Sequence, residues 1–160
     1  MKKIFPILLV MTLLISCREH TQVNSGYPYA YLYEELPFDM PRVEIPTFPD
    51  QQVSVADFGG KPDGITLNTK AFDDAMQALS GMGGGTLVVP KGIWFTGPIV
   101  FRSNINLHLE KGALILFSPD KDLYPLVETV FEGLDTRRCQ SPISGRNLEN
   151  IAITGEGSIN

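Results

Sequence analysis

The chain has 160 residues, of which 43% are hydrophobic and 19% charged, a composition typical of a globular protein with room for one domain. Its 15 glycines and 12 prolines favour short strands joined by many turns over a helical bundle. The formal net charge is −5 and no cluster of Lys and Arg occurs, so the sequence argues against binding to nucleic acid. An anionic sugar would also be repelled at long range, and a site for one would need locally placed cations.

Residues 1–17 have the pattern of an export signal. Lys2 and Lys3 precede an apolar run, from Ile4 to Ile15, that is too short to cross a bilayer. The run is followed by Ser16 and Cys17, an ending that resembles a bacterial lipobox, in which the cysteine is acylated. We therefore expect a membrane-anchored lipoprotein of the periplasm or cell surface, held by acyl chains on Cys17. The alternatives are a plain signal peptide and a buried apolar segment.

Residues 18–50 are expected to form a tether followed by an extension rich in proline and aromatic residues. The prolines between Tyr27 and Pro49 recur too often for a helix or a central strand. The extension contains Tyr29, Tyr31 and Tyr33. These tyrosines could pack on the side of the domain or stack on sugar rings, and both interpretations stay open.

A domain of short strands, preceded by one helix, is expected over residues 51–160. Residues 53–58 predict a strand, and the apolar spacing over 68–81 predicts a helix whose first turn is capped by Asn68 or Thr69. The buried face of this helix is predicted to carry Phe72, Ala75, Met76 and Leu79. Asp73 and Asp74 are predicted on its solvated face, because adjacent helix residues point about 100° apart; a catalytic carboxylate pair is the alternative.

Strand patterns dominate the chain after Gly85. Apolar residues alternate most regularly over 105–109, and turn signals separate the candidates. The other candidates are 86–89, 99–101, 114–117, Ile143 and 151–153. None of the turn signals is the Asn-Gly type that couples hairpins tightly. Periodicity alone leaves a sandwich and a parallel β-helix equally open.

A resemblance to a known family decides between them. The segment Asp57-Phe-Gly-Gly-Lys-Pro-Asp-Gly-Ile-Thr-Leu-Asn-Thr69 resembles the opening motif of pectin-lyase-like β-helix proteins. Further segments, in the same order, resemble glycoside hydrolase family 28, the polygalacturonases. These are residues 83–92, 103–113, 118–125, 132–133, 141–145 and 150–157. The resemblance implies a right-handed parallel β-helix whose first coil is capped by the helix at 68–81, and it covers nearly all of the chain after about Pro37.

Several residues within the matched segments are assigned structural roles only. Asn104 is expected at a corner, where its amide bonds backbone groups that the coil leaves unpaired. Gly92, Gly97 and Gly112 are expected at corners that need a positive φ. Asp57 and Asp63 are expected to brace the turn between the first strand and the helix.

The family resemblance implies inverting hydrolysis of the α-linked galacturonic acid backbone of pectin, with no cofactor. The family's acid and base lie in Asn-Thr-Asp and Asp-Asp motifs, supported by Gly-His-Gly and Arg-Ile-Lys. Asn68-Thr69 is followed by Lys70, Asp73-Asp74 lies in the helix, and His108 is flanked by leucines. We therefore assign no catalytic, cofactor or metal residue to this chain. We expect an N-terminal fragment that is inactive by itself.

Two other functions stay open at this stage. They are a β-helix that binds polysaccharide without cutting it, and a related lyase that uses calcium-binding acids. The lipobox argues against a tailspike-like version of the first. Cys139 has no disulfide partner if Cys17 is acylated, and it is predicted to be a quiet, partly buried thiol.

Overall fold

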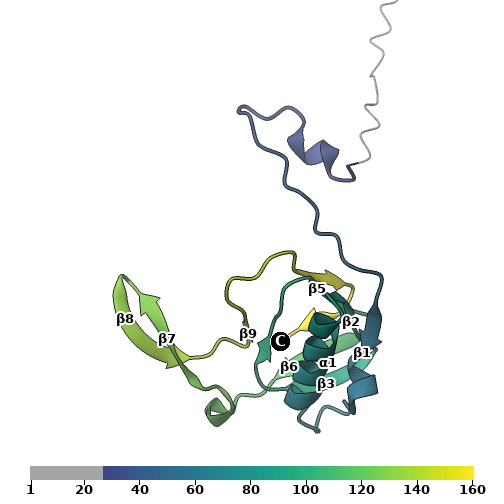
Figure 1. Ribbon diagram of the computed structural model, residues 1–160, viewed down its shortest axis with the longest axis vertical. Coiled ribbons are helices and arrows are strands. Elements are labelled where there is room, and N and C mark those ends of the chain that lie inside the picture. Colours follow the sequence, from purple (N-terminus) through teal and green to yellow (C-terminus); the bar gives the residue numbers. More distant parts are fainter. Residues whose placement is uncertain (1–26) are drawn as a thin grey trace, which may run out of the picture. The chain divides into compact units, whose positions relative to one another are not determined.

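The computed structural model describes residues 27–160 and divides the chain into two compact units at Val43/Glu44. The expected signal peptide and Cys17 lie outside the described residues. The ribbon in Figure 1 shows the strands of the second unit and the capping helix in front of them.

The first unit contains a small aromatic cluster. A 3-10 turn, η1 (Ala30–Tyr33), forms between Pro28 and Pro37, where no proline occurs. The expectation that the extension contains no helical turn is therefore wrong. The hydroxyl oxygens of Tyr27 and Tyr33 lie 3.3 Å apart, and the Arg42 guanidinium lies over both rings. Two of the extension's tyrosines therefore pack against each other and a cation.

The second unit is a parallel β-helix. Successive turns of the chain visit the sheets in the same order, and two turns visit all three, which decides against the sandwich. Sheet A contains β1 (Gln52–Ser54), β2 (Gly85–Val89), β5 (Ile105–Leu109) and β10 (Ala152–Gly155). Sheet B contains β3 (Gly92–Thr96), β6 (Ala113–Phe117) and β11 (Ser158–Ile159), and sheet C contains β4 (Ile99–Val100) and β9 (Ile143–Ser144).

Side chains in register fill the interior of the coils. In sheet A, Leu87 lies beside Leu107, which lies beside Ile153, and Leu87 and Leu107 are fully buried. In sheet B, Trp94 lies beside Ile115, and both are fully buried. Alternate residues of β2 and β5 point inward, as expected for strands with one buried face.

The helix α1 (Thr69–Gly81) covers the first coil. The four residues predicted for its apolar face, Phe72, Ala75, Met76 and Leu79, are all fully buried, which confirms the prediction. The predicted cap is wrong, because neither Asn68 nor Thr69 places its side chain on the first turn. The N-cap is Asn68, but its side chain makes no capping bond.

Asn68 instead ties the cap to the strands. Its amide is 1% exposed, and its Oδ1 accepts a hydrogen bond from Lys61 N at 2.7 Å. Its Nδ2 lies within 3.1 Å of three carbonyl oxygens, those of Lys61, Thr66 and Phe95. Because an amide nitrogen carries two hydrogens, it satisfies two of these carbonyls fully at any moment. The loop before α1 and strand β3 are thus joined through one buried side chain.

The predicted strand over 53–58 is half right. β1 ends at Ser54, and Val55–Phe58 forms a 3-10 helix, η2. Asp57 accepts a hydrogen bond from Ser54 N, and Ser54 Oγ accepts one from Ala56 N, so Asp57 braces this turn as expected. The capping box explains the change, because it favours a helical turn over a continued strand.

Two of the three corner glycines have the expected conformation. Gly92 and Gly112 have φ values of +137° and +84°. Gly97 does not share this conformation, and its role is different from the one predicted. A Cβ on Gly97 would lie 2.9 Å from Thr69 Oγ1, which accepts a hydrogen bond from Gly97 N. Close approach of α1 therefore accounts for this glycine.

Asn104 lies at the corner before β5, with φ of +62°. Its Oδ1 accepts a hydrogen bond from Asn150 Nδ2 at 3.1 Å, so its partner is a side chain of the next coil and not the backbone group expected. Asn150, at the matching corner before β10, has φ of +53° and accepts a hydrogen bond from Thr47 N. The corner amides thus stack from coil to coil.

Replacing Asn68 tests the link between the cap and the strands. Asn68→Ala removes the partner of Lys61 N–H and of the Lys61 and Thr66 carbonyls in a partly buried place, so we expect a loss of roughly 2 to 5 kcal/mol in the free energy of unfolding. Gln77→Ala, at an exposed position of α1, is the matched control and should leave the stability nearly unchanged. Urea denaturation followed by circular dichroism measures both. Equal midpoints for the two variants would contradict this role of Asn68.

Asp63 gives a pH-dependent test of the same loop. Hydrogen bonds from Thr66 N–H, from its hydroxyl and from Ile65 N–H lower the pKa of the Asp63 carboxyl from 3.8 to about 2. A carboxyl whose pKa is lower in the folded protein stabilises it above the unfolded pKa and loses this effect as the pH falls through the folded value. The stability difference between wild type and Asp63→Ala should therefore be constant above about pH 5 and shrink towards pH 2. A carboxyl that titrates near 3.8 by NMR would disprove the assignment.

Candidate functional site

A β-hairpin interrupts the second coil between sheets B and C. β7 (Leu126–Phe131) and β8 (Leu134–Cys139) pair antiparallel, and the hairpin extends away from the coils (Figure 1). Its two-residue turn is Glu132-Gly133, and both residues have positive φ, of +53° and +81°. Such a turn matches the twist of the paired strands. At the hairpin's base, Gln140 N donates a hydrogen bond to Pro125 O at 2.8 Å.

The two faces of the hairpin carry different chemistry. On one face, the Arg138 guanidinium lies 4.4 Å from the centre of the Phe131 ring, a cation–π contact. On the other face, the side chain of Arg137 pairs with Glu128, with 3.0 Å between Nε and Oε1. Neighbouring residues of a strand point to opposite faces, so these two arginines meet different surroundings.

A groove lies between the first of these faces and the chain that leads into and follows β9. We call it the hairpin groove, and its volume is about 620 Å³. It is lined by Val100, Val127, Thr129, Arg138, Cys139, Gln140, Ser141, Ser144, Gly145 and Arg146. Arg146 also donates a hydrogen bond from Nη2 to the backbone oxygen of Glu128 in β7, which ties the groove's two sides together.

The charge of the hairpin groove is positive. Its described lining includes two guanidinium groups and no carboxylate, with hydroxyl and amide groups from Gln140, Ser141 and Ser144. Gln140 Nε2 donates to Ser144 Oγ at 3.1 Å, which positions both side chains. Such a lining can bind an anion and hydrogen-bond to hydroxyl groups. It lacks the carboxylates that acid–base catalysis would need.

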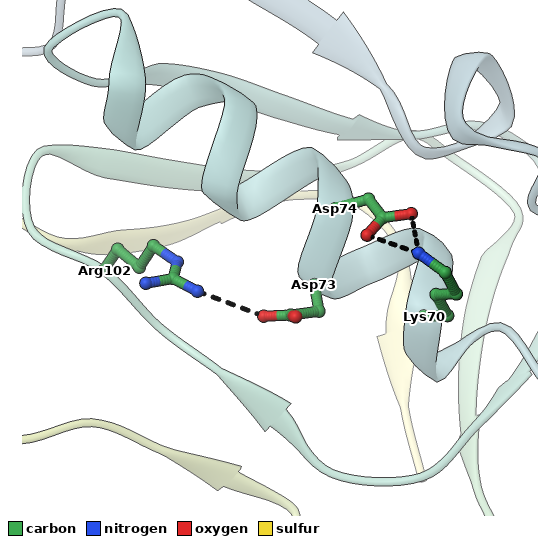
Figure 2. A network of polar contacts seen from close by, with 4 residues as sticks. All are labelled: Lys70, Asp73, Asp74 and Arg102. Atoms are coloured by element: carbon green, nitrogen blue, oxygen red, sulfur yellow. Dashed lines mark hydrogen bonds and ion pairs between the residues drawn. The ribbon is translucent and has the colours of Figure 1, made fainter.

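Asp73 and Asp74 do not form a reactive pair. Figure 2 shows that the two side chains leave α1 in different directions and that each pairs with a different basic residue. Asp74 Oδ2 lies 2.6 Å from Lys70 Nζ, and Asp73 Oδ1 lies 3.2 Å from Arg102 Nη2. Both side chains are at least 38% exposed, so the prediction of a solvated face is confirmed.

His108 lies on the outer face of sheet A. Its Nδ1 lies 2.8 Å from Thr154 Oγ1, which in turn donates to Asn106 Oδ1 at 2.9 Å. Within residues 27–160, no group of three or more His, Cys, Asp or Glu side chains is arranged to hold a metal ion. Among the same residues, no helix has the length and apolar character needed to cross a bilayer.

Cys139 differs from its prediction. It is exposed, not partly buried, because it ends β8 on a hairpin that stands away from the coils. No catalytic residue was predicted in this region, and the hairpin groove was not predicted either. The available signal was the Glu-Gly turn between two alternating segments, at positions 126–139.

Proteins named as polygalacturonases resemble the chain over about two thirds of its length. It is 41% identical over 111 residues to a probable polygalacturonase of Vitis vinifera, covering 64% of this chain and 23% of that protein. It is 30% identical over 115 residues to an exo-poly-alpha-D-galacturonosidase of Dickeya chrysanthemi, covering 67% of this chain and 19% of that protein. The chain thus spans about a fifth to a quarter of the length of these curated relatives. No protein-family model matches it.

Solved structures give the same result. A hyperthermoactive exopolygalacturonase from Thermotoga maritima matches with a TM-score of 0.69 and 41% identity, covering 74% of this chain and 26% of that one. A family 28 exopolygalacturonase from Yersinia enterocolitica matches with a TM-score of 0.61 and 33% identity, covering 69% and 20%. The right-handed parallel β-helix expected from the motifs is therefore confirmed.

Proposed function

This chain is a homologue of the family 28 polygalacturonases, and we propose on that premise that the whole protein is a glycosidase that hydrolyses the galacturonan backbone of pectin. The observation that carries the proposal is that one solved exopolygalacturonase resembles this chain both in fold, with a TM-score of 0.69, and in sequence, with 41% identity. A fold shared without sequence identity would support the architecture alone.

The described residues supply the scaffold of the proposed enzyme and not its acid and base. Inverting hydrolysis needs two carboxyl groups roughly 6.5–9.5 Å apart, with a water between them. The most suggestive pair in the sequence, Asp73 and Asp74, is held by Lys70 and Arg102. We assign the two catalytic carboxyls to the coils of the whole protein that the 160 residues do not include, where the family carries its Asn-Thr-Asp and Asp-Asp motifs.

The proposed location is the outside of a bacterial cell membrane, in the periplasm or at the cell surface. The sequence from Lys2 to Cys17 supports it, with charge, apolar run and cysteine in the order of a lipobox. Two or more acyl chains give a lasting anchor, because each buried CH₂ contributes about 0.8 kcal/mol.

A protein that binds pectic polysaccharide without cutting it is the second candidate. The hairpin groove favours it, since its described lining carries two guanidinium groups and no carboxylate. The two functions differ in their product, because only a hydrolase releases new reducing ends.

Incubation of the whole protein with polygalacturonate tests the proposal. We expect reducing ends to accumulate with polygalacturonate and not with neutral galactan. Binding to the polymer without new reducing ends would leave the non-cutting function in place of the hydrolase. An ultraviolet-absorbing unsaturated uronate product would instead indicate a lyase.

A further inference from the structure

We propose that the hairpin groove binds uronate units of an acidic polysaccharide, with Arg138 and Arg146 as the groups that bind the carboxylates. The inference rests on the proposed function for the identity of the polymer. It adds a binding site outside the catalytic carboxyls, built entirely from described residues between sheet C and the β7–β8 hairpin.

Local charge is the first argument. The protein carries 18 acidic and 13 basic side chains, so its net charge does not attract an anionic polymer. Four basic residues of the described chain lie within 4 Å of a carboxylate, namely Lys70, Arg102, Lys111 and Arg137. Arg138 and Arg146 take part in none of the ion pairs found in residues 27–160, and both line the hairpin groove. The two thus keep their charge for a ligand.

Preorganisation is the second argument. The ring of Phe131 holds the Arg138 guanidinium at 4.4 Å, so this side chain loses less conformational freedom when it binds a ligand. Arg146 is held by its hydrogen bond to the Glu128 backbone oxygen, which leaves other N–H donors of the guanidinium for a carboxylate. A guanidinium and a carboxylate form paired hydrogen bonds, the geometry that distinguishes arginine from lysine at such sites.

The remaining lining fits a sugar. Gln140, Ser141 and Ser144 offer groups that donate and accept hydrogen bonds, as sugar hydroxyls require. Val100 and Val127 add apolar surface for the ring's C–H faces. A volume of about 620 Å³ is within the usual range for small-ligand sites. A simple phosphate site would not need this mixture.

Affinity electrophoresis of the whole protein tests the proposal. Mobility in native gels cast with polygalacturonate, divided by mobility without it, gives the dissociation constant. We expect Arg138→Gln and Arg146→Gln each to weaken binding about 10-fold or more, because each removes charge-assisted hydrogen bonds. Arg137→Gln is the matched control, since it lies next to Arg138 in β8 on the opposite face, and it should change binding less than twofold.

Three further measurements make the result specific. Arg138→Lys, which keeps the charge, should bind with an intermediate affinity, and this distinguishes ligand contact from a damaged hairpin. Gels with neutral galactan should show no retardation for any variant. Gels with dextran sulfate test for a general polyanion site, and equal retardation there would overturn the assignment to uronate.

Failure of this inference is separable from failure of the proposed function. If the whole protein releases reducing ends while all arginine variants bind polygalacturonate equally, the hairpin groove is not the site and the hydrolase remains. If binding depends on Arg138 and Arg146 but no reducing ends appear, the groove is confirmed and the hydrolase is not.

Discussion

The parallel register of sheet A is the constraint on which the rest of the folded unit depends. Leu87, Leu107 and Ile153 occupy one column, so each coil begins at the same place as the coil before it. The corners then repeat as well, and Asn104 and Asn150 meet through their side chains. A one-residue slip would turn the inward column outward, so the register is strongly specified. Because the corners are fixed, the β7–β8 hairpin leaves the coils at a defined place between sheets B and C, and the hairpin groove forms there.

Local patterns in the sequence were enough to predict the parts of the fold that depend on one buried face. Residues 105–109 and the apolar face of α1 were predicted correctly, because their burial follows the 2.0 and 3.6 residue periods. β3 was missed, since turn signals at Pro90 and Gly97 flank a five-residue strand closely. Neither periodicity nor composition decided between sandwich and solenoid. The family resemblance made that decision.

Two of the errors fall where side chains distant in the sequence come together. Asn68 resembles a helix cap, but its Oδ1, the atom that would cap the first turn, accepts a hydrogen bond from Lys61 N. Its Nδ2 donates to carbonyls that include one of β3, 27 residues away. The hairpin groove was missed because its sides come from the hairpin, β4 and the chain around β9, and no local pattern predicts that they meet. The net charge of −5 also does not indicate that two arginines, Arg138 and Arg146, line one groove. Whether a cation is neutralised depends on the face of the strand it occupies, as Arg137 and Arg138 demonstrate.

The stereochemistry of the first product tests the central claim most directly, namely that this chain is part of an inverting galacturonan hydrolase. Proton NMR of polygalacturonate digested by the whole protein resolves the two anomers before they equilibrate. The first signals to appear should be those of the β-anomer, since the substrate linkage is α and one displacement by water inverts it. An α-anomer as first product would indicate a covalent intermediate and contradict the account. An unsaturated product would contradict hydrolysis itself.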